Sequence, residues 1–115
     1  MALAEKKCVS CEEMVAPMSL DQAMEMGRQI PGWEIEEKRI ERTFTFPDFM
    51  GAISFANQIA RVAEEENHHP DLHISWGKVR VELSTHKVGG LSENDFILAA
   101  KIDALADPAE EPPAI

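Results

Sequence analysis

Hydrophobic positions recur along the chain with two different spacings, and the changes of spacing mark out the secondary structure. Apolar residues recur at helical spacing in 20–30, 49–67 and 93–105, and they alternate with polar residues in 33–46 and 72–86. Each alternating stretch is interrupted near its middle, which predicts a hairpin of two strands. The order of elements is therefore αββαββα. We expect an α+β domain in which a four-stranded antiparallel sheet carries its helices packed on one face.

Capping and breaking residues support the predicted helices. Ser19 offers an N-cap for the first helix, and Pro31 ends it. Pro70 stops the second helix, which we expect to run to about residue 67. Ser92 can cap the last helix, with Asp95 at the third helical position, as in a capping box.

The register of the second hairpin depends on its turn. If Gly77 and Lys78 form a two-residue type II′ turn, extrapolation of the ladder places His69 opposite His86. Directly opposed residues have Cβ atoms about 4.5 to 5.5 Å apart, so the two imidazoles could contact one small ligand. One face of the hairpin would then be polar, and it would carry His69, His73, Ser75, Arg80, Glu82, Ser84 and His86.

The two ends of the chain lack a sustained hydrophobic period. Residues 1–17 mix charged residues and cysteines, and we expect them to form a tail. Residues 107–115 contain three prolines and two glutamates, a composition typical of a disordered tail. Residues 18–106 remain as one domain, which suits a chain of 115 residues.

Cys8 and Cys11 form a CxxC motif in the predicted N-terminal tail. No second cysteine pair is present to complete a four-thiolate zinc site. Plain reduced thiols are the simplest interpretation. Metal binding and redox chemistry stay open, although neither a βαβ context nor nearby ligands support them.

The charge balance and the absence of long apolar runs narrow the class of protein. Twenty-one acidic residues against eleven basic ones give a formal charge of -10, which repels phosphate backbones and disfavours direct nucleic-acid binding. No apolar run approaches the roughly 20 residues that cross a bilayer, so we expect no membrane partner. The first residues, MALAEKKC, lack the apolar region of a secretory signal, and we expect a cytoplasmic protein.

Histidine is the residue type here best suited to acid–base chemistry, because its ordinary pKa of about 6.5 lies near neutrality. Glu64 lies four residues before His68, hence on the same helical face if the helix persists that far. We expect Glu65 and Glu66 to form a solvated face. The sequence contains no nucleophile motif, no glycine-rich phosphate loop and no HExxH pattern.

A set of spaced residues resembles the signature of the pterin-4a-carbinolamine dehydratase family, and the flanking elements resemble the fold of that family. The matching residues are Glu64, His68, His69, Pro70, Trp76, His86 and Asp95. The resemblance implies a cytoplasmic hydro-lyase that needs no cofactor and no metal. Its substrate would be a pterin, 4a-hydroxytetrahydropterin, which an aromatic amino-acid hydroxylase produces. Its products would be quinonoid dihydropterin and water. It also implies a homo-oligomer, either a dimer or a tetramer.

The resemblance also implies roles for individual residues. His68, His69 and His86 would be the catalytic imidazoles, Asp95 would orient one of them, and Glu64 would support the pocket. Asp95 could cap its helix at the same time. The remaining signature position, Trp76, could line the pterin ring or belong to the core. His73 lies outside the signature, and Asn67 stands where some relatives have an acid.

Two other functions compete with the dehydratase. Some relatives act as a dimerisation cofactor for a transcription factor or in assembly, so the same fold could serve as a protein-binding module. The three histidines and a carboxylate could also bind a metal, although no standard zinc spacing supports this. The complete histidine set favours the dehydratase.

Overall fold

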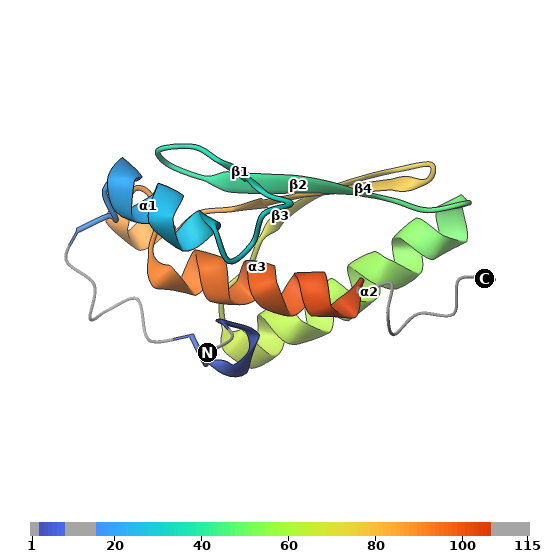
Figure 1. The fold of residues 1–115 in the computed structure, drawn as a ribbon. Helices are drawn as coiled ribbons and strands as arrows, with labels where there is room; N and C mark the ends of the chain where they lie inside the picture. Colours follow the sequence, from blue (N-terminus) through green and yellow to red (C-terminus); the bar gives the residue numbers. More distant parts are fainter. Residues whose placement is uncertain (1–2, 9–15, 107–115) are drawn as a thin grey trace.

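Four antiparallel strands form one sheet in the order β1-β2-β4-β3, and the helices lie along one of its faces (Figure 1). The computed structural model describes residues 3–8 and 16–106. The strands are β1 (Glu34–Ile35), β2 (Ile40–Thr45), β3 (Asp71–Ser75) and β4 (Lys78–Leu83). The helices are α1 (Leu20–Gly27), α2 (Phe49–Glu66) and α3 (Glu93–Leu105), with short 3-10 turns η1 (Leu3–Glu5) and η3 (His86–Val88). The predicted α+β class and the αββαββα order are confirmed.

The core lies between the sheet and the helices. In the central strand β4, Val79, Val81 and Leu83 are fully buried, whereas Lys78 and Arg80 are exposed. This alternation follows from the two-residue period of a strand. The helices supply the other half of the core with Ala52, Phe55, Ile59, Phe96, Leu98 and Ile102. Because a fully buried aliphatic side chain contributes about 1.5 to 3 kcal/mol, this layer holds α2 and α3 against the sheet.

A polar contact fixes the C-terminal half of α3 to the sheet side. Asp103 Oδ1 accepts hydrogen bonds from Trp33 Nε1 at 2.9 Å and from Arg42 Nη1 at 2.8 Å. Burial raises the pKa of the Asp103 carboxyl above its usual value, although the donors on Trp33 and Arg42 oppose the rise. The far end of α3 is therefore anchored independently of its first turn.

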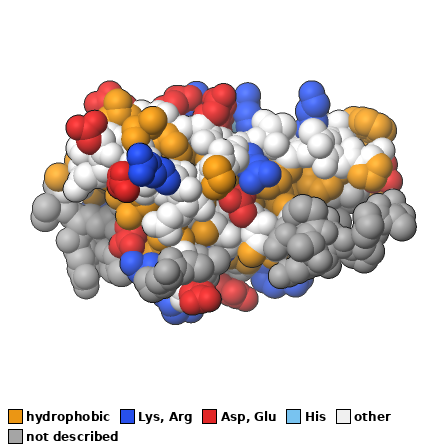
Figure 2. Space-filling view, viewed as in Figure 1, with side chains coloured by type: hydrophobic (Ala, Val, Ile, Leu, Met, Phe, Trp, Pro, Cys, Tyr) orange, Lys and Arg blue, Asp and Glu red, His pale blue; other side chains and the backbone are white. Residues whose placement is uncertain are grey.

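The surface mixes charges of both signs. Figure 2 shows acidic and basic side chains interspersed with hydrophobic ones on the described part of the face viewed there, so the net charge of -10 does not form one broad acidic region on it. None of the helices in residues 3–8 and 16–106 has the length and apolarity that a membrane span requires.

The first helix is shorter than predicted. Ser19 caps it as expected, accepting a hydrogen bond from the backbone N–H of Gln22, but the helix ends at Gly27 rather than near residue 30. Ile35 lies so close to this end that a Cβ on Gly27 would meet its Cγ1 at 2.7 Å. The turn that follows lets Ile30 enter the core.

The turn of the second hairpin differs from the predicted one. Ser75 pairs with Lys78, so the turn consists of Trp76 and Gly77 rather than Gly77 and Lys78. Gly77 has a φ of +70°, and a Cβ there would meet the Phe46 carbonyl oxygen at 2.9 Å, so the position requires glycine. The register moves by two residues, which keeps the paired side chains of β3 and β4 on their predicted faces, while Trp76 moves into the turn.

The expectation of an N-terminal tail is wrong for residues 3–8. Leu3 is buried in the core, and Cys8 packs against it, half-buried. Burial and the nearby Glu66 carboxylate raise the pKa of the Cys8 thiol to about 12. Cys11 and the predicted tail 107–115 lie outside the described residues.

Candidate functional site

The carboxylate of Asp95, in the first turn of α3, is the centre of a buried polar cluster. Its Oδ1 accepts a hydrogen bond from His68 Nε2 at 2.7 Å. Its Oδ2 accepts from Thr85 Oγ1 at 2.9 Å and from the backbone N–H of Ser92 at 3.0 Å. The Asp95 side chain is fully buried, and a buried carboxylate is stable when donors and a helix N-terminus surround it.

His68 reaches Asp95 because α2 ends two residues before it. Asn67 adopts the left-handed conformation, with a φ of 55°, and its N–H bonds back to the last turn of α2. Asparagine tolerates this conformation better than most residues. The chain therefore turns away from the helix axis, and the His68 side chain, only 7% exposed, points at α3.

Glu64 pairs with His69 rather than with His68. The condition under which Glu64 and His68 would share a helical face is not met, because the helix does not continue to residue 68. Glu64 Oε2 instead lies 2.7 Å from His69 Nε2. Both side chains are exposed, at 77% for Glu64 and 53% for His69.

His86 begins the 3-10 turn η3 and does not end a strand. The β3–β4 ladder stops at Asp71 and Glu82, so the predicted strand pairing of His69 with His86 is absent. The backbone of Thr85, immediately before His86, pairs with Gly90, and its hydroxyl donates to Asp95. Asp95 therefore ties the segment that carries His86 to the segment that carries His68 and His69.

Trp76 and His73 lie on the same hairpin but apart from this cluster. Trp76 is in the β3–β4 turn and 69% exposed, so it does not belong to the core. Strand β3 separates it from Pro70 by five extended residues, or about 17 Å. His73 lies within β3, with its Nε2 3.4 Å from a carboxylate oxygen of Glu82. Within one chain, neither residue joins His68 and Asp95.

The cluster gives His68 a defined chemical form. Because Nε2 donates to the Asp95 carboxylate, a neutral ring carries its lone pair on Nδ1. His68 is thus oriented to accept a proton, and His69 has a weaker version of the same arrangement with Glu64.

Sequence reasoning missed the two hydroxyls that complete the cluster. Thr85 Oγ1 lies 2.7 Å from Ser92 Oγ, and because Thr85 donates to Asp95, the Ser92 hydroxyl donates to Thr85. Thr85 falls on the apolar side of the alternating stretch, directly before His86. A hydroxyl at a buried position requires a partner, and this signal could have identified it.

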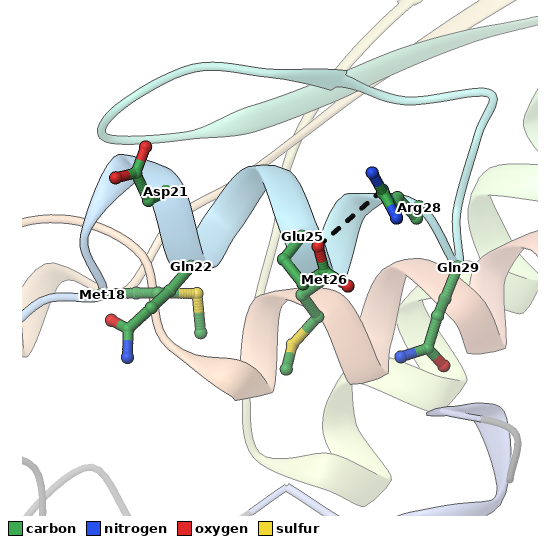
Figure 3. A pocket seen from close by; sticks show the side chains of 7 residues that line it. All are labelled: Met18, Asp21, Gln22, Glu25, Met26, Arg28 and Gln29. Atoms are coloured by element: carbon green, nitrogen blue, oxygen red, sulfur yellow. Dashed lines mark ion pairs between the residues drawn. The ribbon is translucent and has the colours of Figure 1, made fainter.

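Two other features of the described residues stand apart from the histidines. On the β1–β2 hairpin, three glutamates bring their carboxylate oxygens within 4.8 Å of one another and could hold a cation: Glu34, Glu36 and Glu41. Arg39 pairs with two of these three. A groove along α1 contains no histidine; Figure 3 shows its side chains, including two methionines and an ion pair of Glu25 with Arg28.

Comparison with known sequences places the chain among dehydratase relatives. Residues 16–105 match the family model described as "Pterin 4 alpha carbinolamine dehydratase". The chain is 49% identical over 107 residues to a protein of Halorhodospira halophila, covering 91% of this chain and 98% of that protein. It is 44% identical over 104 residues to a protein of Rubrobacter xylanophilus, covering 90% and 97%. Both relatives bear the name pterin-4-alpha-carbinolamine dehydratase as a provisional one.

Two solved structures are similar to this fold. The first, titled transcriptional coactivator/pterin dehydratase from Brucella melitensis, has a TM-score of 0.73 and 34% identity and covers 78% of this chain and 98% of its own. The second, a pterin dehydratase-like protein identified as a RuBisCO assembly factor in the alpha-carboxysome, has a TM-score of 0.55 and 22% identity, with coverage of 65% and 87%. The second comparison shows a shared fold alone.

Proposed function

The chain belongs to the pterin-4-alpha-carbinolamine dehydratase family, and from this premise we propose that it converts 4a-hydroxytetrahydropterin to quinonoid dihydropterin and water by histidine acid–base catalysis. One observation carries the proposal. The Asp95 carboxylate accepts hydrogen bonds from both His68 and Thr85, and Thr85 is the neighbour of His86. One buried group therefore orders the two segments that hold all three histidines of the family signature.

The reaction needs one proton donor and one proton acceptor. The C4a hydroxyl leaves as water once it is protonated, and the proton on N5 leaves as the quinonoid double bond forms. The proton given to the hydroxyl and the proton taken from N5 balance, so no redox partner is required. A well-placed acid or base of this kind contributes roughly 10²- to 10⁴-fold.

We assign the proton transfers to His68 and His86, and the binding of the ring to His69. Asp95 supports this assignment for His68, because it holds Nε2 and leaves Nδ1 to exchange a proton. His86 is exposed beside Thr85, so its ring can reach a ligand. The His69–Glu64 pair is exposed, and it suits polar contact with a substrate more than it suits a fixed proton relay.

The test is steady-state kinetics on histidine variants with 4a-hydroxytetrahydropterin as substrate. His68→Ala or His86→Ala should lower kcat by roughly 10- to 10⁴-fold, whereas His69→Ala should chiefly raise KM, the mark of lost ground-state binding. His73→Ala is the matched control, since His73 lies on β3 outside the cluster. If the double variant His68→Ala, His86→Ala folds and keeps wild-type turnover, the histidine mechanism is wrong.

The same experiment addresses the protein-binding alternative. A family member can share this fold without sharing its catalysis, so a wild-type protein that folds and shows no turnover would favour a binding or assembly role. The complete set of signature histidines supports the enzyme, because a purely structural role for Asp95 requires only His68, its one imidazole partner in the described residues, and not His69 or His86.

A further inference from the structure

A short N-terminal segment, which we call the clasp (residues 6–8), joins the end of α2 to the start of α3. Its contact on α2 is the last residue of that helix, Glu66. Its contacts on α3 are the first two residues of that helix, Glu93 and Asn94. The clasp therefore bridges two segments that are far apart in the sequence.

Glu66 holds one side of this bridge. Its Oε1 accepts a hydrogen bond from the backbone N–H of Cys8 at 2.9 Å. Its Oε2 lies 3.7 Å from Lys101 Nζ on α3 and 3.8 Å from Lys7 Nζ. The Glu66 side chain is only 5% exposed, so the expectation of a solvated Glu66 is wrong, while its neighbour Glu65 is exposed as expected.

The charge state of Glu66 fits this bridging role. Burial raises the pKa of the Glu66 carboxyl. The Cys8 N–H and the ammonium groups of Lys101 and Lys7 together lower it by more, so the pKa lies below its ordinary value. The carboxylate is therefore ionised at neutral pH. An ionised, buried carboxylate with several partners has one favoured position, because any displacement leaves charge uncompensated.

The other side of the bridge is the first turn of α3. Lys6 Nζ forms an ion pair with Glu93, and the Cys8 thiol donates to the Asn94 carbonyl at 3.7 Å. Asn94 is itself buried and immediately precedes Asp95.

The clasp and the His68–Asp95 hydrogen bond connect the same two pieces of backbone. Glu66 lies two residues before His68, and Asn94 lies one residue before Asp95. A shift of the end of α2 relative to α3 would therefore change both the contacts of the clasp and the His68–Asp95 hydrogen bond. The 2.7 Å bond between His68 and Asp95 depends on this relative placement.

We propose that Glu66 is a positioning residue of the active site: by anchoring the clasp and Lys101, it sets the end of α2 against α3 and so holds His68 on Asp95. The proposal rests on the proposed function for its kinetic consequence, but its structural consequence is independent of any substrate. Glu66 touches no reacting group. It acts through the backbone that carries His68.

A structural readout tests the proposal on the intact chain. The Nε2–H proton of His68, buried and bonded to a carboxylate, should be visible in proton NMR spectra at low field, and its loss in His68→Gln assigns it. In Glu66→Ala we expect this proton to exchange with water roughly 10-fold faster, because local opening of the α2 end exposes it. Glu65→Ala is the matched control, an exposed glutamate one residue earlier on the same helix, and it should leave the exchange rate unchanged.

Kinetics provide the second readout. Since a misplacement of about 1 Å can cost roughly 10²-fold, Glu66→Ala should lower kcat about 3- to 30-fold with little change in KM. Glu66→Gln keeps an oxygen for the Cys8 N–H but loses the ion pairs, so it should lower kcat less than Glu66→Ala does. It also serves as the test if Glu66→Ala does not fold.

The outcomes are distinguishable. If His68 shows no protected ring proton in the wild type, or if Glu66→Ala and Glu66→Gln exchange it at the rate of Glu65→Ala, the positioning role is overturned. A wild type without turnover overturns the dehydratase function, and the exchange measurement still decides the role of Glu66. Faster exchange in Glu66→Ala, together with a lower kcat at constant KM, supports both the positioning role of Glu66 and the dehydratase function.

Discussion

The His68–Asp95 and His69–Glu64 pairs have the same N–O distance of 2.7 Å, yet one is buried and the other lies in solvent. The imidazoles are neighbours in the sequence, and each has one carboxylate partner. In the first pair the side chains are 7% and 0% exposed, and in the second 53% and 77%. Distance alone therefore says little about what each pair contributes.

The difference lies in what else surrounds each carboxylate. Asp95 also accepts from Thr85 and Ser92, so its removal leaves several buried donors without a partner. Exposed pairs such as His69–Glu64 gain only about 0 to 1 kcal/mol, because water competes for both partners and salt screens them. The buried region should be rigid and sensitive to substitution, and the exposed pair should be adaptable and tolerant.

The largest expected effect concerns Cys8, whose thiol contacts the carbonyl next to Asp95. A rise of its pKa from 9.0 to about 12 lowers the thiolate fraction at pH 8 by roughly 10³-fold, and alkylation slows in proportion. Iodoacetamide labelling at pH 8, followed by peptide mapping, measures this rate. The control is the same chain unfolded in urea, in which Cys8 should react at an ordinary rate. Equal rates in the two states would show that the buried region opens freely.

The next effect is on stability and compares the two carboxylates directly. Asp95→Ala should lower the free energy of unfolding by about 3 kcal/mol, which changes the unfolding constant by roughly 10²-fold. The reason is that His68, Thr85 and the Ser92 N–H would lose the acceptor of their buried hydrogen bonds. Glu64→Ala should cost at most about 0.5 kcal/mol. Urea denaturation at pH 7 measures both values. Similar losses for the two variants would contradict the distinction between the pairs.

The smallest effect compares the two histidines. His68→Ala should destabilise the fold by about 2 kcal/mol, since it opens a buried space and leaves Asp95 Oδ1 without its donor. His69→Ala should change stability by less than about 0.5 kcal/mol. Thermal unfolding followed by circular dichroism is the measurement. The KM values give a sharper comparison, because there the order should reverse: His69→Ala should raise KM more than His68→Ala does.

The predictable part of the fold is the part that depends on local pattern. The alternation around β4 correctly placed Val79, Val81 and Leu83 in the core, and it did so although the turn was assigned wrongly. A hairpin shifted by two residues keeps its faces, so the core survived the error. The error itself arose because glycine suits either central position of a two-residue turn; in the structure Gly77 takes the second, against the Phe46 carbonyl oxygen.

The parts of the site that escaped prediction depend on tertiary contacts. The partner of Glu64 was misassigned because the left-handed Asn67 redirects the chain before His68. Asparagine at a helix end is a signal for this conformation, but it does not say where the next side chain points. The clasp has no periodic pattern, and its role depends on Cys8 meeting Glu66 and Asn94, which lie far along the chain. Such contacts leave no local pattern to read.

The double attachment of Asp95 has a consequence for how this family diverges. The carboxylate binds the N-terminal turn of α3 as well as His68, so natural selection for folding acts on position 95 whether or not the protein catalyses a reaction. Selection on the exposed His69 and His86 depends on the reaction alone, whereas His68 also supplies a buried donor to Asp95. In a lineage that abandons catalysis, His69 and His86 should be replaced first, and the buried His68–Asp95 pair should persist. Descendants that keep the His68–Asp95 pair without the other two histidines would therefore have kept the fold after losing the reaction.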